Sequence, residues 1–74
     1  MTKLPQIKPK DLLRALQKYG FTRSRQTGSH VYLKHRDGRL TSISIHPQPI
    51  PKGTLRAILK QVKLNPEQIK ELAR

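Results

Sequence analysis

The sequence predicts a single α+β domain, in which two helices cover one face of a three-stranded antiparallel sheet and a short helix follows. Apolar residues recur at helical spacing near both ends of the chain, for example at Leu12, Leu16 and Leu55. Between these segments, apolar and polar residues alternate as in half-buried strands, and Asp37-Gly38 is a strong hairpin signal. A sheet with one apolar face buries that face against amphipathic helices, which gives two layers in the order α-β-β-β-α-α.

The first helix is expected over residues 9–19. Pro9 suits the first helical position, and Asp11 lies in the first turn, near the positive end of the helix dipole. Gly20 should end the helix in a left-handed conformation, with Phe21 packing back against Leu16. The buried stripe of this helix is expected to comprise Leu12, Leu13, Leu16 and Tyr19.

Three strands are expected over residues 21–25, 29–35 and 40–46, with residues 26–28 turning the chain after the first. In the first strand, Arg23 and Arg25 should share one face, opposite Thr22 and Ser24. In the second, Val31 and Leu33 should face the core, while the other face carries His30, Tyr32 and Lys34.

The register of the second hairpin follows from keeping its apolar residues on one face. A two-residue Asp37-Gly38 loop would mix apolar and polar residues on each face, whereas a three-residue loop at 36–38, with Gly38 left-handed, does not. The expected cross-strand pairs are therefore Val31 with Ile43, Leu33 with Thr41, His30 with Ser44, and Tyr32 with Ser42.

A stiff, proline-rich connection over residues 46–51 leads to the second helix. Asn65 should cap the last short helix in a capping box with Gln68. Lys63 stands where a glycine usually ends a helix, so either it adopts a left-handed conformation at a cost of about 1 kcal/mol or the bend is made otherwise. The expected core comprises Leu12, Leu13, Leu16, Phe21, Val31, Leu33, Ile43, Ile45, Leu55, Ile58, Leu59 and Val62.

Composition limits the possible functions. The 74 residues suit one domain, and the absence of cysteine excludes disulfides and thiolate metal sites. No apolar run has the length of a signal peptide or membrane span, so a soluble cytoplasmic protein without membrane contact is expected. The 16 Lys and Arg residues outnumber the four acids and give a net charge of +12, which indicates a polyanion or an acidic protein as partner.

Histidine beside positive charge is the combination most suggestive of chemistry. His30, His35 and His46 are scattered without a carboxylate cluster, so neither a metal site nor another cofactor is expected. An imidazole can, however, remove the 2′-hydroxyl proton of RNA while cations stabilise the charge that develops on the phosphate. His30 is the candidate base, and the candidate RNA-binding groups are Arg23, Arg25, Lys34, the Gly28 and Ser29 amides, and Tyr32, which either stacks on a base or only packs.

Four segments together resemble the HicA toxin family. They are Gly28-Ser29-His30-Val31-Tyr32, the Asp37-Gly38 hairpin, the strand ending at His46, and residues 53–61 (GTLRAILKQ). The opening helix that closes in Tyr19-Gly20-Phe21 fits as well. Two features depart from the family's pattern: Lys63 replaces a common glycine, and residues 47–51 are unusually rich in proline.

This resemblance implies a fold like that of double-stranded-RNA-binding domains and an mRNA interferase activity, neutralised by a cognate HicB antitoxin. The family's essential histidine, in its glycine-serine-histidine motif, falls on His30, with Gly28 and Ser29 as the flank. An acidic, HicB-like antitoxin covering His30 would suit the +12 charge.

The leading hypothesis is therefore a metal-independent endoribonuclease that acts as the toxin of a toxin–antitoxin pair. The alternatives are a non-catalytic RNA-binding module that uses the same basic face, and a protein-interaction module for an acidic partner. Replacing His30 by alanine separates the first two, because RNA affinity should come from the lysines and arginines.

Overall fold

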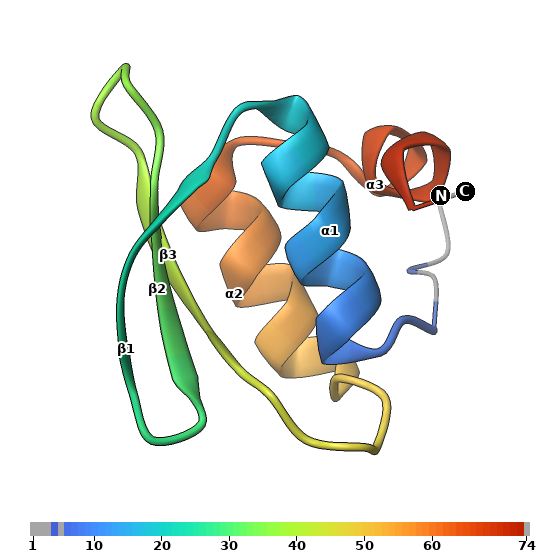
Figure 1. Cartoon of the computed structure of the whole chain (residues 1–74). Coiled ribbons are helices and arrows are strands. Elements are labelled where there is room, and N and C mark those ends of the chain that lie inside the picture. Colours follow the sequence, from blue (N-terminus) through green and yellow to red (C-terminus); the bar gives the residue numbers. More distant parts are fainter. Residues whose placement is uncertain (1–3, 5, 74) are drawn as a thin grey trace.

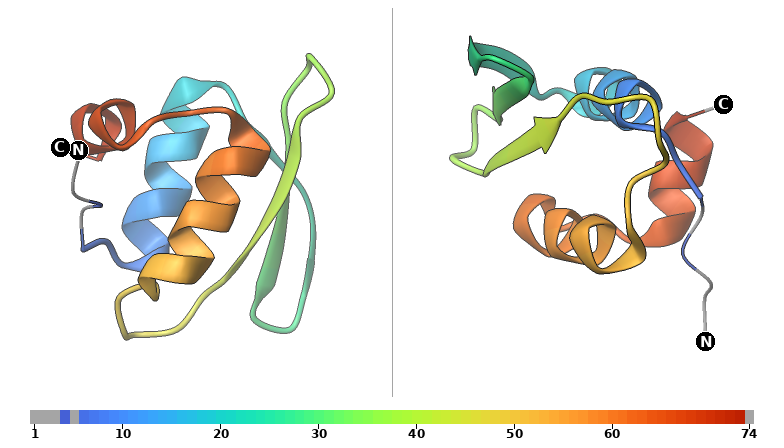
Figure 2. Two further views of the ribbon diagram at one scale, coloured as in Figure 1. Left: turned by 180° about the vertical axis from the view of Figure 1, so that it is seen from behind. Right: turned by 90° about the horizontal axis from the view of Figure 1, so that it is seen from below.

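The computed structural model of the chain describes residue 4 and residues 6–73 and has the expected α-β-β-β-α-α order. The three strands form one antiparallel sheet in the order β1-β2-β3. Helices α1 and α2 lie on the same face of the sheet, and α3 lies beyond them, on the side away from the sheet (Figures 1 and 2). The elements are α1 (Pro9–Tyr19), β1 (Thr22–Thr27), β2 (His30–Lys34), β3 (Leu40–Ser44), α2 (Lys52–Val62) and α3 (Pro66–Leu72).

Helix α1 begins and ends where its sequence predicts. Pro9 occupies the first turn, while Lys8 offers no side-chain cap. At the other end Gly20 has φ 124°, and the amide of Phe21 donates a 2.9 Å hydrogen bond to the carbonyl of Leu16. Phe21 is 2% exposed, so the predicted packing at this helix end is confirmed.

The β2–β3 hairpin has the predicted register. Val31 pairs with Ile43 and Leu33 with Thr41, which places these residues on the core side. The His35 amide donates a 2.9 Å hydrogen bond to the Arg39 carbonyl, so residues 36–38 form the three-residue loop. Gly38 has φ 100°, a conformation that favours glycine.

Strand β1 differs from its prediction in both length and facing. It runs to Thr27, so the turn to β2 is Gly28-Ser29 and not residues 26–28. A β-bulge shifts its register: Arg23 pairs with Leu33, whereas Arg25 pairs with Tyr32. The expectation that Arg23 and Arg25 share a face is therefore wrong, because the extra residue of a bulge reverses the alternation that follows it.

The core agrees with the prediction except at two positions. The prediction for Tyr19, expected in the buried stripe of α1, is wrong: this residue is 36% exposed at the end of the helix. All predicted core residues are buried except Ile45, which is half-buried because β3 ends at Ser44. Further buried residues lie outside the predicted core. Two of them connect distant segments, because the amide of Ile50 donates a 2.8 Å hydrogen bond to the carbonyl of Ile7. These additions are Ile7, Ala15, Ile50, Leu64 and Ile69.

The predicted break between α2 and α3 is confirmed. Lys63 has φ 58° and is the only residue other than glycine with positive φ in the described part of the chain. Asn65 and Gln68 form the capping box: the Asn65 side chain accepts from the Gln68 amide at 2.8 Å, and the Gln68 side chain accepts from the Asn65 amide at 2.9 Å. Within the described residues, no helix combines the length and apolar character needed to span a membrane.

Arg39 ties the β2–β3 hairpin to both helices. Its guanidinium donates hydrogen bonds to the Asp37 carboxylate, to the carbonyl of Val62 at the end of α2, and to the hydroxyl of Tyr19 at the end of α1. The hydrogen bond from the Arg39 side chain places the pKa of Asp37 well below its ordinary value, and the hydrogen bonds to Asp37 and Tyr19 raise the pKa of Arg39. The sequence prediction did not single out Arg39, because two of these three partners lie about 20 residues away along the chain.

Candidate functional site

The outer face of the sheet, which turns away from α1 and α2, is the candidate functional site. Strand β2 contributes His30, Tyr32 and Lys34, which alternate with the buried Val31 and Leu33. From the neighbouring strands, the residues paired with His30 or Tyr32 are Thr27 and Arg25 of β1, and Ser44 and Ser42 of β3.

Three side chains form a row across this outer face. The Arg25 guanidinium carbon lies 4.6 Å from the centroid of the Tyr32 ring, a cation–π contact that holds both side chains. The rings of Tyr32 and His30 are 6.5 Å apart between centroids and inclined by 30°. His30 is exposed, whereas Tyr32 is half-buried. An aromatic surface beside an imidazole and a guanidinium is thus presented to solvent.

The β1–β2 turn fixes the backbone next to His30. It has two residues, and Gly28 at its first position has φ 59°, as in a type II′ turn. The Gln26 side chain donates a 3.1 Å hydrogen bond to the Gly28 carbonyl, and the Ile45 amide donates a 2.8 Å hydrogen bond to the Ser29 carbonyl. The turn next to His30 is therefore held by hydrogen bonds from β1 and from the residue that follows β3.

The outer face carries positive charge without acidic residues. All four acids of the chain lie elsewhere: Asp11 on α1, Asp37 in the β2–β3 loop, and Glu67 and Glu71 on α3. Arg25 and Lys34 are accordingly available to an anion that approaches the face.

The structure brings together most of the predicted site residues. Arg25, His30, Tyr32 and Lys34 share the outer face, and Gly28 and Ser29 form the adjoining turn. Arg23 lies on the other face of β1, where its guanidinium is 3.5 Å from the Gln26 side-chain oxygen. Thr27 was missed at this site, because the turn was expected one residue earlier; it lies directly opposite His30.

The two other histidines have different surroundings. The ring of His35 packs edge-on against Phe21 at 5.0 Å between centroids, and its Nδ1 accepts a hydrogen bond from the Asp37 amide. His46 is exposed just beyond β3. Among residues 4 and 6–73, no group of three or more histidine, aspartate or glutamate side chains is placed to hold a metal ion.

Comparison with protein families gives one match that covers most of the chain. A model of the HicA toxin of bacterial toxin–antitoxin systems matches residues 9–64, from the start of α1 to the α2–α3 connection. The chain belongs to the HicA toxin family. This HicA protein is therefore the toxin of a toxin–antitoxin pair, which implies an antitoxin partner. A comparison with curated proteins gives no significant match.

The matched segment contains the Gly28-Ser29-His30 turn, the outer face of the sheet and helix α2. Helix α3 lies outside the match, although it packs against α1 and contributes the buried Ile69.

Proposed function

We propose that this HicA toxin is a metal-independent endoribonuclease that cleaves mRNA in the cytoplasm, with His30 as the general base. The observation that supports this most is an exposed imidazole on a face that has cations but no acidic residue, beside an anchored glycine turn. An anionic substrate is attracted to such a face, and an imidazole is suited to proton transfer at neutral pH.

In the proposed step, His30 removes the proton from a ribose 2′-hydroxyl. The 2′-oxygen then attacks the adjacent phosphorus, and the bond from phosphorus to the 5′-oxygen breaks. The 5′-oxygen takes a proton from solvent, which leaves a 2′,3′-cyclic phosphate on one fragment and a 5′-hydroxyl on the other. The reaction needs no external nucleophile, because the 2′-hydroxyl is already positioned for attack.

The neighbours of His30 would bind the RNA and stabilise the developing charge. Arg25 and Lys34 are placed to contact phosphates, and the Gly28 and Ser29 amides to donate to a phosphate oxygen. Tyr32 offers a ring on which an unpaired base can stack. Arg23, on the other face of β1, would contribute only long-range attraction.

The same outer face would also be the surface that the antitoxin blocks. An acidic, HicB-like protein covering His30 would be steered by the +12 charge and would exclude RNA from the histidine. Binding would also stabilise the folded toxin, because the partner binds only the native state.

Cleavage and affinity, measured on the same variants, test this proposal. His30→Ala should abolish cleavage of single-stranded RNA in excess chelator and leave RNA affinity and its salt dependence nearly unchanged. His46→Ala is the matched control, because His46 is also an exposed histidine but lies just beyond β3, and this variant should cleave like the parent.

Three other results would contradict the proposal. Equal cleavage by the parent and His30→Ala would remove His30 from catalysis. Salt-sensitive RNA binding without cleavage by either protein would indicate a non-catalytic RNA-binding module. Failure of the parent to bind RNA even at low salt would indicate a module for an acidic protein partner.

A further inference from the structure

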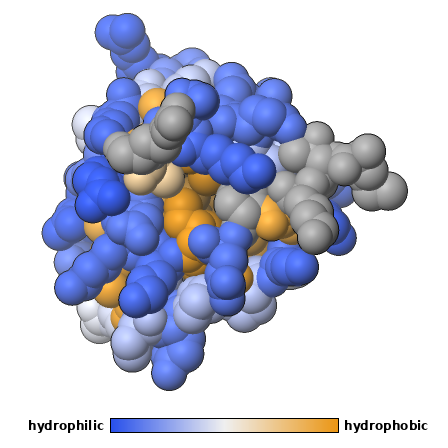
Figure 3. All heavy atoms as spheres, turned by 90° about the vertical axis from the view of Figure 1, so that its right-hand side faces the viewer, coloured by the Kyte–Doolittle hydropathy of each residue, from blue (hydrophilic) through white to orange (hydrophobic). Residues whose placement is uncertain are grey.

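A second surface, on the side of the molecule away from the sheet, forms a groove with a volume of about 810 Å³. It lies between α2, the α2–α3 connection and the start of α3. On the side of the molecule away from the sheet, Figure 3 shows apolar residues gathered in a strip between hydrophilic ones. Leu4, Leu59, Leu64 and Pro66 are its apolar lining residues.

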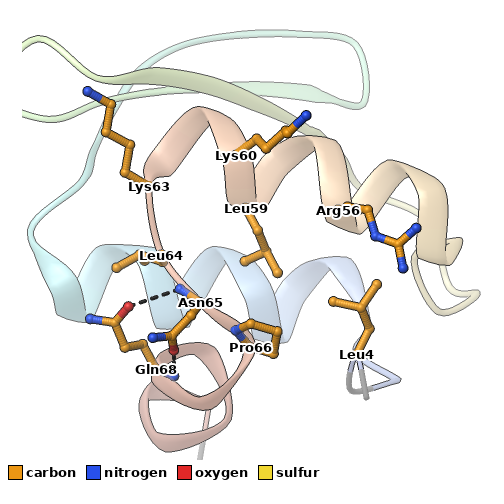
Figure 4. Close-up of a pocket in the computed structure, with 9 residues that line it drawn as sticks. All are labelled: Leu4, Arg56, Leu59, Lys60, Lys63, Leu64, Asn65, Pro66 and Gln68. Atoms are coloured by element: carbon orange, nitrogen blue, oxygen red, sulfur yellow. Dashed lines mark hydrogen bonds between the residues drawn. The ribbon is translucent and has the colours of Figure 1, made fainter. Parts of the chain in front are cut away.

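The local backbone explains the apolar floor. Because Lys63 adopts a left-handed conformation, the chain turns back at the end of α2, and the Leu64 amide donates a 3.2 Å hydrogen bond to the Leu59 carbonyl. This six-residue hydrogen bond of a Schellman motif is commonly accompanied by an apolar contact between the residues that it joins. Pro66 then extends the floor toward α3 (Figure 4).

Positive charge borders one side of the groove. Arg56, Lys60 and Lys63 line it from α2 and the residue that ends it, and none of the described residues that line it is acidic. In Figure 4 the side chains of Lys60 and Lys63 extend from α2 away from α3, so their charges lie at the border of the groove. Within the described part of the chain, their charged groups form no ion pair. On the α3 side the lining is uncharged, and the Asn65 and Gln68 side chains are held in the capping box.

We propose that this groove binds an acidic segment of the antitoxin that inserts an apolar side chain between α2 and α3. The three cations suit carboxylates, and the apolar floor suits an aliphatic or aromatic side chain. RNA is the less suitable occupant, because a sugar-phosphate backbone would match the cations but leave the floor uncovered. The family match implies that this toxin has an antitoxin partner. The net charge of +12 favours an acidic segment of that partner.

The proposed contact is separate from the outer face and does not depend on the role of His30. The groove lies between α2 and α3, whereas the outer face is the face of the sheet that turns away from the helices, so an antitoxin that reaches both would bind more tightly than through either surface alone. An antitoxin segment in the groove would leave the row of Arg25, Tyr32 and His30 accessible.

Charge reversal in the groove tests the proposal, and the probe is the cognate antitoxin of this toxin. Arg56→Glu/Lys60→Glu should weaken antitoxin binding, measured by calorimetry, by about tenfold or more. Lys8→Glu/Lys10→Glu is the matched control: it makes the same change in net charge at exposed positions near the start of α1, and it should weaken binding by less than about threefold. Circular dichroism melting shows whether each variant folds.

If the charge-reversed groove variant does not fold, a second variant that only removes the two charges provides the same test. Arg56→Ala/Lys60→Ala should show the same loss in smaller degree, because alanine suits a helix. Equal effects of the groove and control variants on antitoxin affinity would overturn the proposal. So would a loss of RNA affinity specific to the groove variants without a loss of antitoxin affinity, which would make the groove an RNA surface. These measurements of antitoxin binding stand whether or not His30 proves catalytic.

Discussion

Arg23 and Arg25 have the same charge on the same strand, yet only Arg25 lies over Tyr32 on the outer face. The bulge between them turns Arg23 toward the side of Leu33. Both residues are exposed and carry the same charge. Substituting each in turn therefore shows whether RNA binding depends on the position of the arginine or only on its charge.

Arg25→Ala should therefore weaken RNA binding and slow cleavage more than Arg23→Ala. Loss of a phosphate contact should also lower the slope of log affinity against log salt by about 1 for Arg25→Ala. Filter binding at several salt concentrations measures this slope. Equal losses for the two variants would show that the outer face is not the RNA-binding surface.

Asp37 gives a prediction about pH. Its pKa lies well below the ordinary value because the Arg39 side chain donates hydrogen bonds to the carboxylate. A carboxyl group whose pKa is lowered by folding stabilises the native state above its unfolded-state pKa and loses this effect as the pH falls. Asp37→Asn should thus lower Tm at pH 7, and its difference from the parent should shrink below about pH 4. A difference in Tm that stays constant from pH 7 to pH 2 would contradict this account.

The face of the sheet on which a residue lies was predictable where the alternation of side chains along a strand is unbroken. The placement of His30, Tyr32 and Lys34 on the outer face follows from the buried Val31 and Leu33 between them. Arg23 was misplaced because a bulge has no dependable local sequence signal. Arg39 was missed because its contacts with Tyr19 and Val62 exist only in the folded chain.

At the scale of elements, the α2–α3 junction carries strain that can be measured. Lys63 adopts φ 58° and ψ 43°, which costs a residue with a side chain more than it costs glycine. Lys63→Gly should raise the free energy of unfolding by about 1 kcal/mol, measured by urea denaturation. Lys60→Gly, within α2, is the control and should lower it by about 1 kcal/mol. Destabilisation by both substitutions would show that the left-handed conformation at Lys63 carries no strain.

Helix boundaries were predictable from local chemistry, whereas strand ends were predicted less well: β1 ends at Thr27 and not at residue 25, and β3 ends at Ser44 and not at residue 46. Pro9, Gly20 and the Asn65–Gln68 capping box mark helix ends through their own dihedral angles and hydrogen bonds. The end of β1 differs from the prediction because Gly28 begins a two-residue turn, whereas it was expected to end a three-residue turn. The resulting pairing of Thr27 with His30 follows from the turn and not from strand propensity.

At the scale of the whole molecule, α3 completes a small core. Ile69 is fully buried, and α3 packs on α1, although the family match ends at residue 64. Ile69→Ala should lower the free energy of unfolding by about 2 to 5 kcal/mol. For a domain of this size the total is about 4 to 11 kcal/mol, so the loss is a large fraction. Lys70→Ala, the exposed neighbour, should change it by less than about 0.5 kcal/mol. Equal small effects would show that α3 is not part of the cooperative unit.

The chemistry of the cleaved ends tests the central claim most directly. The parent toxin and His30→Ala would be incubated with RNA in excess chelator, and the termini of any fragments identified by mass spectrometry. We expect fragments ending in a 2′,3′-cyclic phosphate and a 5′-hydroxyl from the parent alone, since the 2′-oxygen is the nucleophile. Fragments with the same ends from His30→Ala, or fragments ending in a 3′-hydroxyl from the parent, would contradict the role proposed for His30.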